Sequence, residues 1–160
     1  MEIFSLNEVI ELAVQIEKNG YQFYDAAFKR KDLSSKAREL IERLRDEELQ
    51  HEATFKNLRS SLDYEKLGDL IDWQQAASYL KAISDAHIFS DPAASIKLAT
   101  SASDESEIIE FAFRFEKDTL IFFYSLHHTT TEISVKKIIN KIIDEEVTHV
   151  MLLMDMKKEL

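Results

Sequence analysis

The hexapeptide DEELQH at residues 46–51 returns almost unchanged as DEEVTH at residues 144–149. Both copies end in Glu-x-x-His, in which the two side chains are three positions apart. On an α-helix such residues share a face, so the Glu and His of each copy can reach one point. A solvated helix surface explains one copy, because charged side chains are common there. It does not explain two copies, and the segments that precede them in the sequence are also alike.

An interior glutamate precedes each hexapeptide within a segment that is itself repeated. The two segments are IEKNGYQFY (16–24) and FEKDTLIFFY (115–124). Glu17 lies 31 residues before Glu48, and Glu116 lies 30 residues before Glu146. The chain therefore contains one unit written twice, which predicts two similar halves related by a pseudo-two-fold axis.

The composition favours a helical protein without disulfides. The 160 residues suit a single domain, which we place at 1–160, and they include only two Gly and one Pro. The absence of Cys excludes disulfides, iron–sulfur sites and thiolate chemistry. A net charge of −10 argues against nucleic acid or an anionic membrane as partner. No membrane-length apolar run or basic leader is visible, so we expect a cytoplasmic protein.

Periodicity of 3.6 residues predicts an all-α fold with four long helices. Their expected ranges are about 6–30, 35–60, 104–128 and 132–158. Short connections within the first and the second pair predict two antiparallel helix hairpins. The hairpins are joined by a crossover at about 61–103, in which we expect one short helix around Trp73–Ile83. Capping boxes are expected from Ser5 and Glu8, and from Asp104 and Glu107.

Each long helix carries an apolar stripe that a carboxylate interrupts near its middle. The first two stripes are Ile10, Val14, Glu17, Tyr21, Tyr24, Phe28 and Ala37, Ile41, Leu44, Glu48, His51, Phe55, Leu58. The other two are Ile109, Phe113, Glu116, Leu120, Phe123, His127 and Val135, Ile139, Ile142, Glu146, His149, Leu153, Met156. In the second and fourth stripes a His follows the Glu one turn later.

Burying four carboxylates and two imidazoles without a counter-charge would be very costly. Two divalent cations would balance the formal charge of four ionised glutamates. The stripes therefore predict a dinuclear metal site. Its expected ligands are Glu17, Glu48, His51, Glu116, Glu146 and His149.

A Glu from each of two helices and Glu-x-x-His from each of two others is the ligand pattern of ferritin-like dinuclear proteins. On Glu17, EELQH, Glu116 and EEVTH, the chain resembles the rubrerythrin-like branch of that superfamily over nearly its whole length. The resemblance implies a ferritin-like four-helix bundle with two Fe ions, with Mn or a mixed pair as alternatives.

The chain departs from the rubrerythrin pattern in two respects. Rubrerythrins often carry a seventh carboxylate near the position of Glu116, where this chain has Phe113 and Thr119 one turn away. The C-terminal rubredoxin module is absent, because it would need four Cys. By this resemblance the chain would take electrons from a separate donor protein.

Several neighbouring residues allow two interpretations each. Tyr24 shares the face of Glu17, and it either hydrogen-bonds a carboxylate or a bound oxygen species near the metals or packs as a core residue. Glu47 and Glu145 either orient the His of the opposite helix or are solvated charges, and the second interpretation is preferred. The pattern indicates no role for His87 in the crossover.

The segment FAFRFEKDTLIFFYSL at 111–126 is apolar on more than one face. A helix that buries two faces needs a second partner, which predicts a homodimer through this helix. The alternative is cover from the crossover alone.

Three functions remain open at this stage. The first is a di-iron oxidoreductase that reduces hydrogen peroxide with electrons from an external donor. The alternative is a ferroxidase or iron-binding ferritin-like protein, which uses the same six ligands to oxidise iron with O2 and then passes it on or stores it. The third is a metal-free helical interaction module.

Overall fold

The computed structural model of the chain describes residues 6–61, 70–89 and 91–160, with side chains from Asn7 and, after the first gap, from Gln75. These residues form six helices and no strand. The helices are α1 (Leu6–Phe28), α2 (Ser35–Ser61), α3 (Leu70–Asp85), α4 (Pro92–Ser101), α5 (Glu105–Thr129) and α6 (Ile133–Glu159). The four long helices lie within a few residues of their expected ranges. In the part of the chain that the structure describes, no helix has the length and hydropathy of a membrane span.

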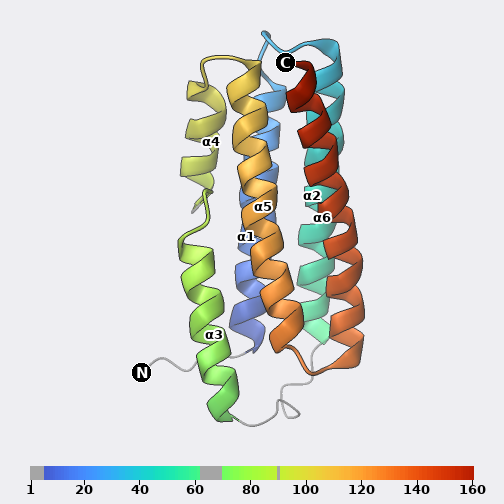
Figure 1. Cartoon of the computed structure of the whole chain (residues 1–160). Helices are drawn as coiled ribbons and strands as arrows, with labels where there is room; N and C mark the ends of the chain where they lie inside the picture. Colours follow the sequence, from blue (N-terminus) through green and yellow to red (C-terminus); the bar gives the residue numbers. More distant parts are fainter. Residues whose placement is uncertain (1–5, 62–69, 90) are drawn as a thin grey trace.

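The long helices form two antiparallel hairpins, α1 with α2 and α5 with α6 (Figure 1). Their connecting turns lie at opposite ends of the molecule, and the hairpins pack side by side through α1 with α5 and α2 with α6. All four long helices therefore pass the middle of the molecule, where the predicted ligands lie. The chain ends at the same end of the molecule as the α1–α2 turn (Figure 1).

The crossover contains two helices, whereas one was expected. The helix expected around Trp73–Ile83 is α3, whereas α4 was not expected. Pro92 occupies the first turn of α4, where its missing N–H costs nothing. Asp91 caps this helix by accepting a hydrogen bond from the backbone N–H of Ala94 at 2.8 Å.

Helices α3 and α4 follow one another along one side of the molecule and contact both α1 and α5 (Figure 1). This packing explains why α1 and α5 bury two faces. On α5, Phe115, Thr119 and Phe122 are buried outside the predicted stripe, while Phe113 and Leu120 within that stripe are only half-buried. The crossover therefore covers part of the second apolar face of α5, as the alternative to a dimer interface required.

The predicted stripes on α2 and α6 are correct at every position, since all seven residues of each are buried.

The N-terminus of α5 has a side-chain cap close to the one expected. Asp104 caps α5 by accepting from the N–H of Glu107, and Glu107 accepts in return from the N–H of Ser103 rather than from that of the cap residue. The capping box expected at Ser5 lies outside the described residues.

Candidate metal centre

The six residues expected to bind metal meet in the middle of the molecule. Glu17 comes from α1, Glu116 from α5, and each Glu-x-x-His pair from α2 or α6. All four glutamates and His149 are fully buried, and His51 is 3 % exposed. Because Glu and His three positions apart share a helix face, each pair points to the interior together, as the sequence predicted.

The six side chains form two sets of four that share two members. One set contains Glu17, Glu48, His51 and Glu146, and the other contains Glu48, Glu116, Glu146 and His149. Within each set, one ligand atom per residue lies within 4.8 Å of all the others. Each set can therefore hold one ion, with Glu48 and Glu146 placed to bridge a pair.

The hydrogen bonding of these atoms fits a bound cation. Ten buried side-chain oxygen and nitrogen atoms in the described residues have no hydrogen-bond partner, and nine of them belong to the six predicted ligands. Buried polar atoms are normally paired, and unpaired ones cost free energy. Nine such atoms gathered in one cluster are compatible with a site for metal ions.

Both imidazoles turn the same ring atom to the interior. Nδ1 of His51 lies 2.8 Å from Oε1 of Glu146, and Nδ1 of His149 lies 2.9 Å from Oε2 of the same residue. These contacts lack the geometry of a hydrogen bond. The two rings lie nearly parallel, with centroids 5.8 Å apart. The Nδ1 atoms are thus the ring atoms available to a metal.

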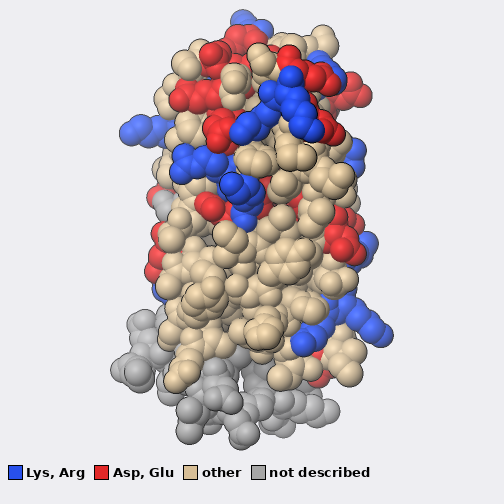
Figure 2. All heavy atoms as spheres, viewed as in Figure 1, with Lys and Arg blue, Asp and Glu red and all other residues tan. Residues whose placement is uncertain are grey.

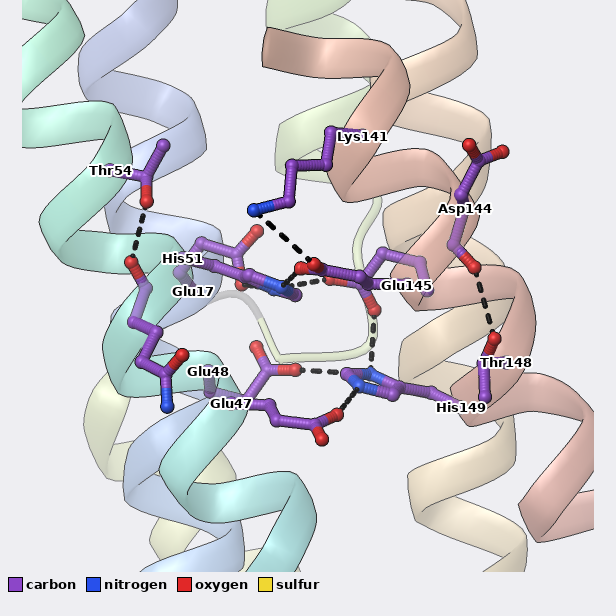
Figure 3. Close-up of polar contacts among 12 residues, drawn as sticks. Glu17, Glu47, Glu48, His51, Thr54, Lys141, Asp144, Glu145, Thr148 and His149 are labelled. Carbon is purple, nitrogen blue, oxygen red and sulfur yellow. Dashed lines mark hydrogen bonds and ion pairs between the residues drawn. The ribbon is translucent and has the colours of Figure 1, made fainter.

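Glu47 and Glu145, which were expected to be solvated, contact the outward Nε2 atoms of the two imidazoles. Nε2 of His51 lies 2.7 Å from Oε2 of Glu145, and Nε2 of His149 lies 2.5 Å from Oε2 of Glu47 (Figure 3). The interpretation as solvated charges was incomplete, since each glutamate reaches across to the His of the opposite hairpin while its side chain stays 28 % (Glu47) or 43 % (Glu145) exposed. Such a contact fixes the tautomer and ring orientation of a metal ligand.

Each of these carboxylates also contacts a cation one turn earlier on its own helix. Arg43 donates to Glu47 at 2.9 Å, and Nζ of Lys141 lies 3.8 Å from Glu145. The hydrogen bonds from His149 and Arg43 lower the pKa of Glu47 to about 2. Glu47 is therefore ionised at neutral pH and accepts from the imidazole.

Burial and mutual repulsion set the charge of the inner cluster. Burial raises the pKa of Glu48 and of Glu17, and it raises the pKa of Glu116 to about 8. Burial would lower the pKa of His51, but the facing Glu146 and Glu17 raise it to about 11. Without metal the cluster therefore retains protons, which cations would displace on binding.

Tyr24 is fully buried, and its hydroxyl donates a short hydrogen bond to Oε1 of Glu116. This is the first of its two expected roles. Burial and the nearby carboxylates raise the pKa of Tyr24 well above 10, so the phenol keeps its proton. Its counterpart in the second half, Phe123, has no hydroxyl.

Gly20 allows α1 to approach this cluster closely. A Cβ atom at this position would overlap the ring of Phe115 and lie 2.7 Å from Oε2 of Glu48. Both neighbours are fully buried and have little room to move. The glycine, which the sequence analysis did not single out, therefore makes space for the carboxylate.

Residues of α2 and α6 line a surface pocket of about 290 Å³. It is lined by Arg43, Glu47, Gln50, His51, Glu145 and Thr148. His51, which is 3 % exposed, is the one predicted ligand among the residues that line this pocket.

Comparisons with known protein families, with curated proteins and with solved structures find no match for this chain. The described residues form an all-helical fold with a buried cluster of Glu and His that could hold metal ions. This arrangement fits a ferritin-like dinuclear site.

Proposed function

We propose that the chain is a ferritin-like four-helix bundle that binds two iron ions. Glu17 and His51 would hold one ion, Glu116 and His149 the other, and Glu48 and Glu146 would bridge them. The observation that supports this proposal is the group of nine unpaired ligand atoms in one buried cluster. A metal-free interaction module would have no use for such a cluster, whose cost in stability a metal would offset.

The proposed activity is the reduction of hydrogen peroxide with electrons from an external donor protein. Two ferrous ions would supply the two electrons that, with two protons, convert one H2O2 into two water molecules. Within the chain, Glu47 and Glu145 hold the imidazoles in place, and Tyr24 holds a proton at Glu116. The pocket between α2 and α6 is lined by His51, and in this proposal it would be the route by which small molecules reach the cluster.

A second candidate is a ferroxidase, which oxidises ferrous iron and passes it on. The observation in its favour is that two carboxylates, Glu47 and Glu145, line the surface pocket beside His51. Arg43 and Lys141 offset the charges of these carboxylates, so what favours the ferroxidase is the set of oxygen atoms that they present to an entering cation. The two activities differ in substrate, so separate assays with peroxide plus a reductant, and with Fe²⁺ plus O2, distinguish them.

Metal content of the purified protein is the first measurement. We expect two metal ions per chain by elemental analysis of protein prepared without chelator, and their loss in Glu48→Ala and His51→Ala. The exposed Glu39→Ala on α2 is the matched control and should keep both ions. A wild-type protein that contains no metal and takes up none from Fe²⁺ under anaerobic conditions would refute the proposal.

A further inference from the structure

The two ligand sets are built alike, and the main difference between them is one neighbour. Each set has one His, one carboxylate of its own and a share in Glu48 and Glu146. Each His is held from outside by a carboxylate of the opposite hairpin. The difference is that Tyr24 donates to Glu116, whereas both oxygens of Glu17 are without a hydrogen-bond partner.

The position of Tyr24 is fixed by its surroundings. Its ring packs edge-on against Phe23 at 5.3 Å and against Phe115 at 6.1 Å between centroids. All three side chains are fully buried, so the hydroxyl has no alternative position in water. The packing therefore holds the hydroxyl within hydrogen-bond reach of Glu116. In the second half of the chain, the equivalent Phe123 packs against Phe55 and offers no donor.

We propose that the two metal positions are unequal, and that the position built on Glu17 and His51 fills before the position built on Glu116 and His149. The inference rests on the proposed dinuclear site. Glu17 can offer two free oxygens to an ion, whereas Glu116 offers Oε2 alone without competition. A carboxylate that accepts a hydrogen bond also donates less charge to a metal, since the proton draws on the same lone pairs.

One difference acts in the opposite direction, but more weakly. His149 is held by Glu47 at 2.5 Å, slightly closer than the 2.7 Å between His51 and Glu145. Both imidazoles are nevertheless oriented by a carboxylate. Engagement of one oxygen on a direct ligand is the larger effect, because only Glu116 has such a hydrogen bond, whereas the two imidazole contacts differ only slightly in length.

The test is a titration of the metal-free protein with Co²⁺, followed by calorimetry and by the visible absorption bands of the bound ion. We expect two steps of one ion each, with dissociation constants that differ about tenfold or more. Repulsion between two cations separates the steps by itself. The deciding result is therefore that Tyr24→Phe brings the two constants closer together by strengthening the second step.

Three further variants assign the steps and control for general effects. Glu17→Gln should remove the tighter step, and Glu116→Gln should remove the weaker one. Tyr21→Phe, a half-buried tyrosine on the same helix, should leave both constants unchanged. Circular dichroism of each variant would show that it remains folded.

Two results would overturn the inference while leaving the dinuclear site intact. One is a separation of the two constants that is the same in wild type and Tyr24→Phe. The other is loss of the tighter step in Glu116→Gln rather than in Glu17→Gln. Failure of the wild-type protein to bind any Co²⁺ would instead refute the site itself.

Discussion

At the scale of single residues, the main finding is the exchange of carboxylates between the hairpins. Glu47 of the first hairpin holds His149, and Glu145 of the second hairpin holds His51. Each carboxylate accepts from Nε2–H, so Nδ1 is the ring atom that faces the cluster. The two contacts are reciprocal, as expected if a pseudo-two-fold axis relates the two halves.

Replacing either outer carboxylate should weaken metal binding without removing a ligand. We expect Glu47→Gln and Glu145→Gln each to lower the affinity for Co²⁺ about 10- to 100-fold, the range observed when such contacts to metal ligands are lost. In Glu47→Gln the loss should fall on the step assigned to His149, and in Glu145→Gln on the step assigned to His51. The titration described above measures both.

The control for this prediction is Glu42→Gln, which changes an exposed glutamate on α2. It should bind Co²⁺ as the wild type does. If Glu47→Gln and Glu145→Gln also bind like wild type, the contacts between carboxylate and imidazole do not orient the ligands.

The cluster should also lower the stability of the metal-free protein. Both oxygens of Glu48 are buried and unpaired, and burial with three neighbouring carboxylates raises its pKa. We expect Glu48→Gln, which keeps the shape and needs no proton to be neutral when buried, to raise the stability of the metal-free protein by on the order of 1 kcal/mol. For a chain of this length that corresponds to about 2–4 °C in melting temperature.

Thermal unfolding of both proteins with excess EDTA tests this prediction, and the same scans with Co²⁺ provide the contrast. With metal present the order should reverse, because binding stabilises only the protein that retains the site. A metal-free Glu48→Gln protein that melts well below the wild type would show that the carboxylate is paired in a way not described above.

The sequence predicted the six inner residues but not the two outer ones, and the reason is physical. Glu and His at a spacing of three share a helix face whatever surrounds the helix, so the spacing alone indicates a common target. The partner of Glu47 or Glu145, one position earlier, depends on how the two hairpins are rotated against each other. The Asp-Glu pair that precedes both Glu-x-x-His motifs was the one sequence signal that Glu47 and Glu145 have matching roles.

At the scale of helices, the segment His87–Phe89 links the crossover to the turn of α5 that follows Glu116. Nε2 of His87 lies 3.1 Å from the hydroxyl of Thr119, and Nδ1 accepts from the N–H of Phe89 at 3.3 Å. The N–H of Ile88 donates to Asp118, while Asn19 of α1 donates to the carbonyl of Phe89. The crossover thus ties α1 to α5 beside the site.

His87 should make the protein sensitive to mild acid. Its Nδ1 is occupied as an acceptor, and burial lowers its pKa to about 4 despite the nearby charge of Asp118. In the unfolded chain its pKa is near 6.5, so between about pH 4 and 6.5 the unfolded state binds the extra proton. Stability from this residue is present above pH 6.5 and is lost as the pH falls, by up to about 3 kcal/mol.

Urea unfolding of the metal-free protein at several pH values between 4.5 and 7 measures this slope. In His87→Gln the free energy of unfolding should fall less steeply with acid than in wild type. His128→Gln, an exposed His at the end of α5, is the control and should keep the wild-type slope. Equal slopes in wild type and His87→Gln would show that another group carries the acid sensitivity.

The structure of the helices was predictable to different degrees. On α2 and α6 a single apolar stripe determines the buried face, and every position was assigned correctly. On α1 and α5 the apolar residues surround much of the helix, so periodicity could not tell which face meets the other hairpin and which meets the crossover. Helix α4 was missed because its short sequence, PAASIKLATS, has no clear stripe.

At the scale of the whole molecule, α5 still exposes large apolar side chains after the crossover has covered its second face. Ile121 is 52 % exposed and Tyr124 is 54 % exposed, and they share a face of α5. The face of the molecule in Figure 2 has few charged side chains over the end of α5 that leads into α6. We propose that a second copy of the chain covers this surface.

The choice of a second copy follows from charge. Two molecules that each carry −10 repel over most of their surface and approach most easily where neither is charged. A two-fold dimer also places each apolar patch against its own equivalent.

Ile121→Glu should therefore shift the protein from dimer to monomer, because it places a pair of like charges in the contact. Sedimentation velocity at micromolar concentration measures the shift. Met154→Glu on α6, where the native side chain is 42 % exposed, is the matched control and should stay dimeric. A wild-type protein that is monomeric at high concentration would contradict the proposed contact.

The reciprocal carboxylates have a consequence for how such a chain can evolve. Each half encodes the group that orients the imidazole of the other half, so neither copy of the repeat is complete by itself. We expect a change at position 47 to act on the imidazole at position 149, and a change at position 145 to act on the imidazole at position 51. Selection on one half of the repeat would therefore act on the other half as well.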